Sequence, residues 1–171
     1  MRKADIHPAR TVLVLGAILI LFGCGSTRET SNEPMLIGWV NRTEVMSGAY
    51  PRFQARYDTV QTDPEVLDLI RTFNEGTDWL VFLGSWCSDS YREVPAFLKI
   101  ADSSGIGGTR IRYYALDRDK KSPEGLEQRY GVTHVPTIIG IRDGSEIGRI
   151  TEKSDPSVED EMLRIILGEG E

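Results

Sequence analysis

An apolar segment that runs directly into a cysteine and then into a helix constrains this fold more than any other feature. Residues 80–84 are apolar over the length of a buried strand. Residues 86–90 read Trp-Cys-Ser-Asp-Ser, and residues 91–101 have the pattern of a helix. Cys87 is therefore predicted to lie where a strand passes into a helix. The N–H groups and dipole of a helix N-terminus stabilise a thiolate there, although a lone cysteine can also be just a small buried apolar residue.

The same five residues have the outline of a Trp-Cys-x-x-Cys redox site in which Ser90 replaces the second cysteine. Without that thiol, no intramolecular disulfide closes after Cys87 attacks a substrate. Asp89 places a carboxylate that disfavours a thiolate at Cys87, or it caps the helix and complements the helix dipole. Ser90 either donates a hydrogen bond to the thiolate or lies in the first helical turn without a chemical role.

Two later segments extend this pattern. Residues 111–117 are predicted to form a strand that ends in an aspartate. Residues 130–137 read Tyr-Gly-Val-Thr-His-Val-Pro-Thr, and an apolar strand over residues 138–141 and a turn over residues 142–144 follow them. Together with Pro95, eight residues after Cys87, these segments resemble the thioredoxin superfamily over residues 64–167.

The resemblance implies an α/β thioredoxin-like fold, in which a mixed central sheet is flanked by helices. It also implies that the Val135-Pro136 bond is cis and faces Cys87, and that backbone groups there pair with a bound peptide. His134 is expected at the rim of the site, where it can receive a proton, or in solvent as an ordinary loop residue. The residues expected to bind substrate are Trp86, His134, Val135, Pro136 and Thr137.

Residues 84–95 are most similar to a bacterial subgroup with a Trp-Cys-x-Asp-Ser site. Two positions depart from ordinary thioredoxins: Ser90 replaces the resolving cysteine, and Val81 stands where the family has a buried aspartate that assists proton transfer. The resemblance therefore implies a site that forms a mixed disulfide but does not resolve it alone. Its expected catalytic residues are Cys87, Asp89 and Ser90.

The N-terminus has the pattern of an export signal. Arg2, Lys3 and Arg10 precede an apolar region over residues 11–22, which is short for a membrane-spanning helix. Residues 21–24, Leu-Phe-Gly-Cys, resemble a bacterial lipobox, in which the cysteine is acylated and becomes the first mature residue. We therefore expect Cys24 to carry a lipid that holds the protein in the cell envelope, outside the cytoplasm. The alternative is an uncleaved anchor helix that ends in cysteine.

Four parts follow from this pattern: a lipoprotein signal peptide over residues 1–23, a flexible tether over residues 24–34, an N-terminal extension over residues 35–62, and a thioredoxin-like domain over residues 63–171. Removal of the signal peptide takes away three basic and one acidic residue. The remaining 148 residues have 17 basic and 25 acidic side chains and a net charge of −8. This charge argues against nucleic acid as a partner and against broad electrostatic binding to a membrane.

Local signals place further elements. Asp63 is a predicted N-cap and Pro64 the first residue of a helix, whose apolar face comprises Val66, Leu67, Ile70 and Phe73. Residues 123–129 and 155–167 are predicted helices and residues 103–109 a loop, whereas residues 35–40 and 50–57 show no regular pattern. Cys24 and Cys87 leave no pair for a structural disulfide. No His/Cys cluster with metal spacing and no phosphate-binding loop is present in the sequence, so we expect no metal and no cofactor.

Two functions remain open. In the first, Cys87 of a membrane-tethered monothiol oxidoreductase attacks protein or small-molecule disulfides, and an external thiol resolves the adduct. In the second, the groove at Pro136 binds extended peptides, as in a chaperone-like module, and Cys87 is incidental. A cysteine peroxidase is less consistent with the sequence, because the Pro-x-x-x-Thr-x-x-Cys pattern of such sites is missing.

Overall fold

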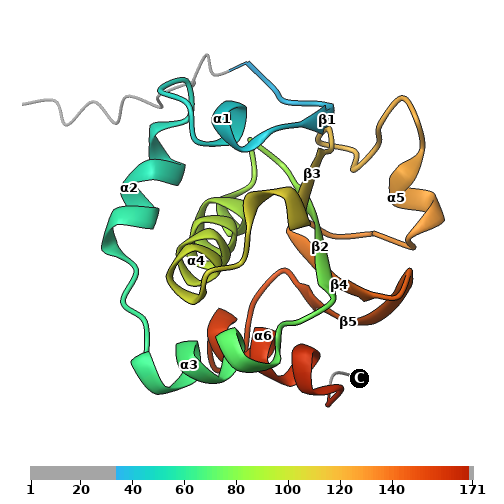
Figure 1. Ribbon diagram of the computed structural model, residues 1–171. Coiled ribbons are helices and arrows are strands. Elements are labelled where there is room, and N and C mark those ends of the chain that lie inside the picture. Colours follow the sequence, from blue (N-terminus) through green and yellow to red (C-terminus); the bar gives the residue numbers. More distant parts are fainter. Residues whose placement is uncertain (1–33, 170–171) are drawn as a thin grey trace, which may run out of the picture. The chain divides into compact units, whose positions relative to one another are not determined.

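A five-stranded mixed sheet forms the centre of the computed structural model, which describes residues 34–169 (Figure 1). Its strands are β1 (Gly38–Val40), β2 (Thr77–Leu83), β3 (Ile111–Ala115), β4 (Thr137–Arg142) and β5 (Ser145–Thr151), in the spatial order β1-β3-β2-β4-β5. β2 and β3 are parallel, and the other neighbours are antiparallel. The predicted mixed sheet is thus confirmed. Asp143 and Gly144 form the hairpin turn after β4, both with positive φ.

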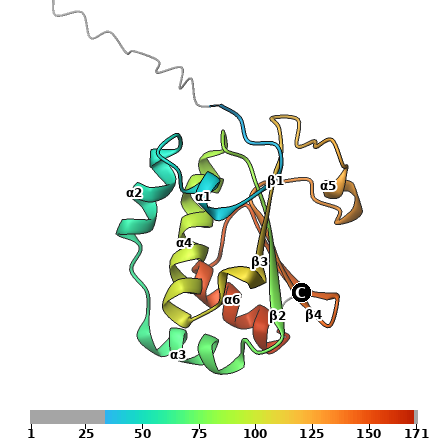
Figure 2. The same cartoon turned by 45° about the horizontal axis from the view of Figure 1, so that its top comes forward.

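Helices cover the two faces of the sheet unequally. α2 (Pro51–Thr59), α3 (Pro64–Phe73), α4 (Ser88–Ser104) and α6 (Val158–Leu167) lie on one face, and the short α5 (Leu126–Arg129) lies on the other (Figure 2). α1 (Arg42–Val45) and a 3-10 turn (Gly108–Arg110) complete the elements that residues 34–169 contain. As predicted, the Asp63 side chain caps α3, where it accepts a hydrogen bond from the Glu65 N–H (2.9 Å). None of these helices combines the length and the apolar character needed to cross a bilayer.

The alternation of side chains along β2 builds two hydrophobic cores and explains its continuous apolar run. Trp79, Val81 and Leu83 point toward the helical layer, whereas Leu80 and Phe82 belong to the core on the α5 side. Trp86 and Cys87 pack against that second core. β2 is therefore packed on both of its faces, and this packing fixes the position of the loop that follows it and carries Cys87.

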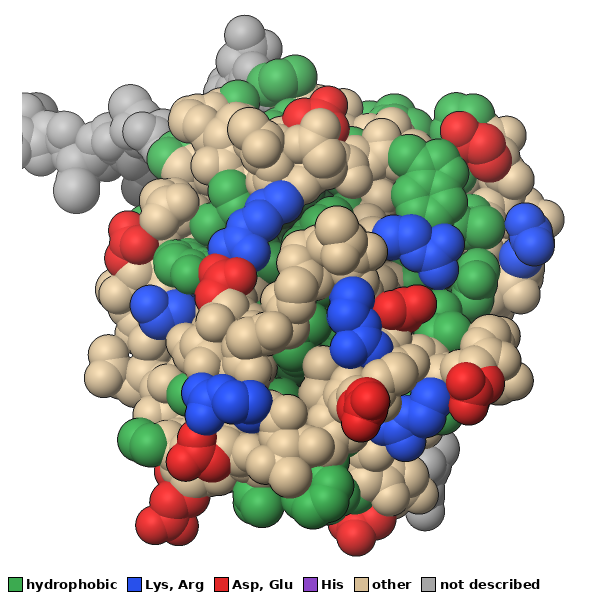
Figure 3. Space-filling model, in the orientation of Figure 1, with side chains coloured by type: hydrophobic (Ala, Val, Ile, Leu, Met, Phe, Trp, Pro, Cys, Tyr) green, Lys and Arg blue, Asp and Glu red, His purple; other side chains and the backbone are tan. Residues whose placement is uncertain are grey.

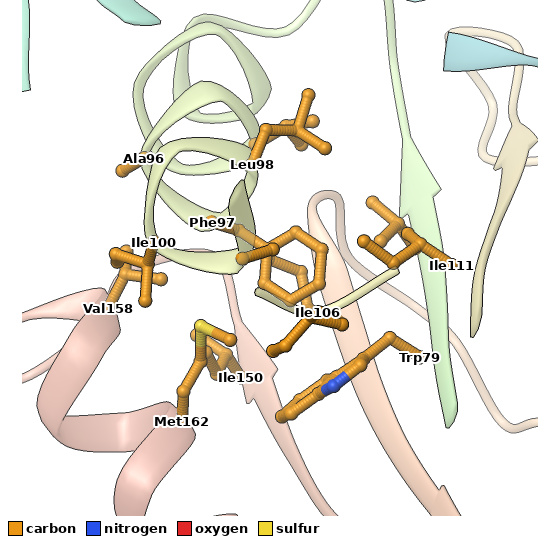
Figure 4. Close-up of a cluster of buried hydrophobic side chains, with 14 of the residues drawn as sticks. Trp79, Ala96, Phe97, Leu98, Ile100, Ile106, Ile111, Ile150, Val158 and Met162 are labelled. Atoms are coloured by element: carbon orange, nitrogen blue, oxygen red, sulfur yellow. The ribbon is translucent and has the colours of Figure 1, made fainter. Parts of the chain in front are cut away.

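Trp79 is the largest fully buried side chain of residues 34–169 and belongs to the helical-side core, where Figure 4 shows it below Phe97 and Ile106. Its ring meets that of Phe97 edge-on, with 5.3 Å between the centroids. Gly140 is its partner on β4, and a Cβ at Gly140 would lie only 2.6 Å from Cγ2 of Ile165. The missing side chain lets α6 approach the sheet at this point.

The segment before α3 is tied to the rest of the domain at several points. β1 pairs with β3 at the edge of the sheet, and α2 packs along α4. Arg42 forms a two-pronged ion pair with Asp102 at the end of α4 (2.7 and 2.5 Å). Residues 35–40 and 50–57, for which the sequence showed no regular pattern, thus contain β1 and most of α2.

Tyr113 on β3 yields a stability prediction. Its buried hydroxyl has no hydrogen-bond partner among the described residues, and burial raises its pKa to about 12. This value lies above the ordinary pKa of about 10, so the folded protein resists ionisation of the hydroxyl. The ionisation of Tyr113 therefore leaves the free energy of unfolding unchanged below pH 10 and lowers it as the pH rises toward 12.

The Tyr113→Phe variant should be as stable as the wild type at neutral pH or more stable by about 1 kcal/mol, and should lose less stability in alkali. Urea unfolding at pH 7 and pH 11 measures both effects. Tyr57→Phe is the matched control, since the Tyr57 hydroxyl donates a hydrogen bond to Asp102 (2.6 Å) and its loss should destabilise the protein. A clear loss of stability at pH 7 in Tyr113→Phe would show that the Tyr113 hydroxyl does have a hydrogen-bond partner.

Candidate functional site

Cys87 lies between β2 and α4 and is the N-cap residue of α4, as the sequence predicted. Its N–H donates a hydrogen bond to the Gly84 carbonyl (3.0 Å), and its carbonyl accepts one from the Tyr91 N–H (3.1 Å). The side chain makes no capping hydrogen bond and is partly exposed. The backbone therefore holds a partly exposed Cys87 at the start of a long helix.

The loop before β4 lies directly opposite this sulfur. The Cys87 thiol donates a hydrogen bond to the Val135 carbonyl (Sγ to O, 3.2 Å). The Val135-Pro136 bond is cis, as predicted, and both residues are buried. Since β2 and β4 are neighbours, with Phe82 opposite Thr137, the residues that follow β2 meet those that precede β4. The sheet topology thus brings together two segments that lie 48 residues apart.

The remaining residues of this loop differ in their position. Thr137 is buried at the start of β4, and its hydroxyl donates a hydrogen bond to the His134 carbonyl (2.8 Å). The His134 side chain is exposed, and its Nδ1 pairs with the Thr133 hydroxyl (2.9 Å). The backbone of His134 therefore supports the loop, whereas its ring bonds to the adjacent residue.

Trp86 closes one side of the site. Its indole N–H donates a hydrogen bond to the Leu116 carbonyl (2.9 Å), and the Arg118 guanidinium lies 5.6 Å from the ring centre. A Cβ at Gly84 would lie 2.8 Å from the indole, so only glycine fits there without a shift of the ring. The sequence analysis did not identify Leu116 or Arg118 as neighbours of Trp86. Both residues follow the end of β3 closely, and that position is the sequence signal that could have identified them.

Ser90 is completely buried, one helical turn after Cys87. Its Oγ accepts a hydrogen bond from the Gly84 N–H (3.1 Å). A buried N–H without a partner costs about 1–3 kcal/mol, so this hydroxyl stabilises the loop between β2 and α4. The sequence did not predict this hydrogen bond.

Asp89, in the first turn of α4, forms an ion pair with Arg92 (2.8 Å). Arg92 also contacts Glu93 (2.5 Å), and this buried carboxylate accepts a further hydrogen bond from the Ser154 hydroxyl (2.8 Å). The negative charge of Asp89 is therefore compensated by a cation on the next turn. The sequence placed Asp89 beside Cys87 but did not identify Arg92 as its partner.

This pairing gives a prediction for the reactivity of Cys87. Asp89→Asn removes a negative charge near the sulfur and should accelerate alkylation roughly two- to fivefold at pH 7, because the thiolate is the reactive form. Arg92→Gln leaves the Asp89 charge uncompensated and should slow it. Iodoacetamide labelling followed by mass spectrometry measures both rates, with thermal melts to confirm folding. Rates that change in the same direction in both variants would contradict the prediction.

The described residues provide neither a second thiol nor a metal site. Cys87 is the free cysteine of residues 34–169, and within that range no three His, Cys, Asp or Glu side chains gather closely enough to hold a metal ion. Cys24 and the signal peptide over residues 1–23 lie outside the described residues. The arrangement is suited to nucleophilic attack by one thiol at a helix N-terminus.

Solved structures of other proteins resemble this chain in fold. A protein of unknown function from Pseudomonas aeruginosa is 16% identical, with a TM-score of 0.52, over 72% of this chain and 84% of its own. An HIV epitope scaffold has the same identity and TM-score over 71% and 84%. Thioredoxin from Fasciola hepatica is 24% identical over 48% and 74%, with a TM-score of 0.34. None of the curated proteins compared matches this chain significantly.

The first two structures are too different in sequence to indicate more than a shared fold. A family model described as thioredoxin matches residues 42–159 and thus more than half of the chain. This range includes the Cys87 loop, α4 and the loop before β4. The chain therefore belongs to the thioredoxin family.

Proposed function

We propose that this protein exchanges thiols and disulfides through the single thiol of Cys87 and depends on an external thiol to complete each cycle. The observation that carries the proposal is the position of Cys87 at the N-cap of α4, partly exposed, with its sulfur 3.2 Å from the Val135 carbonyl. At this place the sulfur faces the loop before β4, over which the substrate is expected to lie. A cysteine that served only as core packing would have no need of this exposure.

The proposed reaction has two balanced steps. The Cys87 thiolate attacks one sulfur of a substrate disulfide, a mixed disulfide forms, and the other sulfur leaves as a thiolate. An external thiolate, from a small molecule or a second protein, then attacks the mixed disulfide and releases Cys87. Ser90 has no sulfur with which to replace this second nucleophile. The protein therefore transfers a disulfide bond between partners and is itself unchanged.

The substrate is expected to lie over the loop before β4. The backbone at Val135 and Pro136, whose side chains are buried, would pair with an extended segment next to the disulfide, and Trp86 would border that segment. The hydrogen bond from the Thr137 hydroxyl to the His134 carbonyl supports the shape of this loop. Proteins or small molecules that carry accessible disulfides are the expected partners.

A lipid on Cys24 is the second part of the proposal. Removal of residues 1–23 would make Cys24 the first mature residue, and the tether over residues 24–34 would join the lipid to the domain. The protein would then lie in the cell envelope, outside the cytoplasm. Cys24→Ser should abolish membrane attachment, which fractionation after a high-salt wash measures. A Cys24→Ser protein of mature size that still sediments with membranes would contradict the lipid anchor.

The exchange reaction has a direct test. The reduced Cys24→Ser protein, in which Cys87 is the one cysteine left in the sequence, is mixed with a peptide disulfide that carries a thiopyridyl leaving group, and the released thiopyridone is measured. One equivalent per chain should be released, the mixed disulfide at Cys87 should persist, and glutathione should then free the peptide. Cys87→Ser is the control and should release none.

The opposite result would favour the second function. If Cys87 releases no thiopyridone while the peptide still binds, the exchange proposal fails and a peptide-binding module remains. An adduct that resolves without added thiol would also contradict the proposed mechanism, because it would require a second thiol within the chain.

A further inference from the structure

The first residues of the described chain expose an unusual row of apolar side chains. Met35, Ile37 and Trp39 are 43%, 44% and 50% exposed. Leu36 and Val40, between and after them, pack against the helical-side core instead. Figure 3 shows hydrophobic side chains at the surface over β1. We refer to Met35, Ile37 and Trp39 as the N-terminal apolar strip.

This strip lies at the end of the domain that carries Cys87. The Leu36 N–H donates a hydrogen bond to the Ser85 hydroxyl (3.0 Å), within the loop between β2 and α4. The Tyr50 hydroxyl holds the chain two residues earlier, by donating a hydrogen bond to the Pro34 carbonyl (2.6 Å). In the sheet, Gly38 pairs with Ala115 at the end of β3. The start of the domain is thus fixed beside the candidate site.

The length of the proposed tether limits how far this end can lie from a membrane. Nine residues lie between Cys24 and Pro34, and the ten fully extended steps from one to the other span at most about 36 Å. A lipid on Cys24 would therefore keep the start of the domain, which carries the N-terminal apolar strip, within about 36 Å of the bilayer surface. The negative net charge of the mature chain gives no general electrostatic attraction to that surface, and the strip offers an apolar contact instead.

We propose that the N-terminal apolar strip inserts into the surface of the same bilayer that holds the Cys24 lipid. The end of the domain that carries Cys87 then faces the membrane. Trp side chains favour the region between lipid headgroups and acyl chains, and exposed apolar patches mark such contact surfaces. This inference rests on the proposed lipid anchor. It narrows the substrates to disulfides exposed near the membrane surface, on lipid-anchored or membrane-spanning proteins.

Energy transfer tests this orientation, because the mature lipoprotein would present Cys87 as its free thiol. The lipoprotein is labelled there with a donor and reconstituted into vesicles of phosphatidylethanolamine and phosphatidylglycerol that contain acceptor-labelled headgroups. The comparison protein carries Cys87→Ser and Glu75→Cys, which moves the label to the opposite end of β2. Transfer from Cys87 should be at least about twice as efficient, because β2 separates the two ends by roughly 20 Å.

Matched variants separate contact of the strip from the effect of the tether alone. Ile37→Ser should lower the transfer from Cys87, whereas Leu69→Ser, at an equally exposed position (44%) on α3, should leave it unchanged. Equal transfer from both ends, or no effect of Ile37→Ser, would overturn the proposed orientation while the lipid anchor stands. Transfer between copies of the protein in place of transfer to lipid would assign the strip to a second copy and also overturn it. Failure of the unlabelled protein to float with vesicles would refute the anchor, and the orientation with it.

Discussion

The Ser90→Cys variant should reduce protein disulfides catalytically, at a rate at least about tenfold above that of the wild type, because it supplies the second thiol that closes an intramolecular disulfide. Residues three apart on a helix lie on the same face, so a thiol at this position lies next to Cys87. In the thiopyridyl assay the adduct should then resolve by itself and release the peptide without glutathione. Reduction of insulin by dithiothreitol, followed by turbidity, measures the catalytic rate.

The buried environment of Ser90 determines the controls. Its hydroxyl accepts the Gly84 N–H (3.1 Å), and a thiol is a weaker acceptor, so the variant should lose about 1 kcal/mol of stability. Ser104→Cys is the matched control, since Ser104 is also a buried serine of α4 but lies at its far end. It should gain no activity, and neither should Ser90→Cys combined with Cys87→Ser. A folded Ser90→Cys protein that forms no intramolecular disulfide would contradict the assignment of this position.

The fold was largely predictable because its signals are local and strong. The continuous apolar run of β2 follows from burial on both faces, and Asp63 and Pro64 mark the start of α3 as side-chain cap and first helical residue. β1 and α2 were missed for physical reasons. β1 has only three residues, too few to show alternation, and among the nine residues of α2 only Phe53 is buried. The apolar face predicted for α3 was partly wrong, because Phe73 is half-exposed near the end of that helix.

The backbone of the site was predictable, because the family pattern fixes it. The hydrogen-bond and ion-pair partners of the side chains were less predictable. The cysteine at the N-cap of α4 and the cis bond before Pro136 were both expected. The hydrogen bond from Trp86 to Leu116 and the ion pair from Arg92 to Asp89 were not. The first joins segments 30 residues apart, and the second is one of two ion pairs that Arg92 makes on α4. Sequence spacing alone does not choose among such alternatives.

The largest loss of stability is expected from Trp79→Ala. The indole is fully buried and meets Phe97 at 5.3 Å in the core between the sheet and the helices. Removal of a buried aromatic side chain leaves a cavity and costs about 3–5 kcal/mol, which should lower the melting temperature by roughly 10–20 °C. Because Trp79 lies on the strand that leads to Cys87, the reactive thiol should be exposed at a lower denaturant concentration as well.

Phe73→Ala provides the comparison that isolates burial from aromatic character. Phe73 is half-exposed at the end of α3, so the same type of truncation should cost less than about 1 kcal/mol there. Urea unfolding followed by circular dichroism gives the free energy of unfolding, and labelling of Cys87 during unfolding reports the site in the same samples. If Trp79→Ala were no more destabilised than Phe73→Ala, the central position of Trp79 would be wrong. If it lost stability while Cys87 stayed protected to the wild-type midpoint, the cysteine loop would not depend on the core beneath β2, and its placement by that strand would have to be revised.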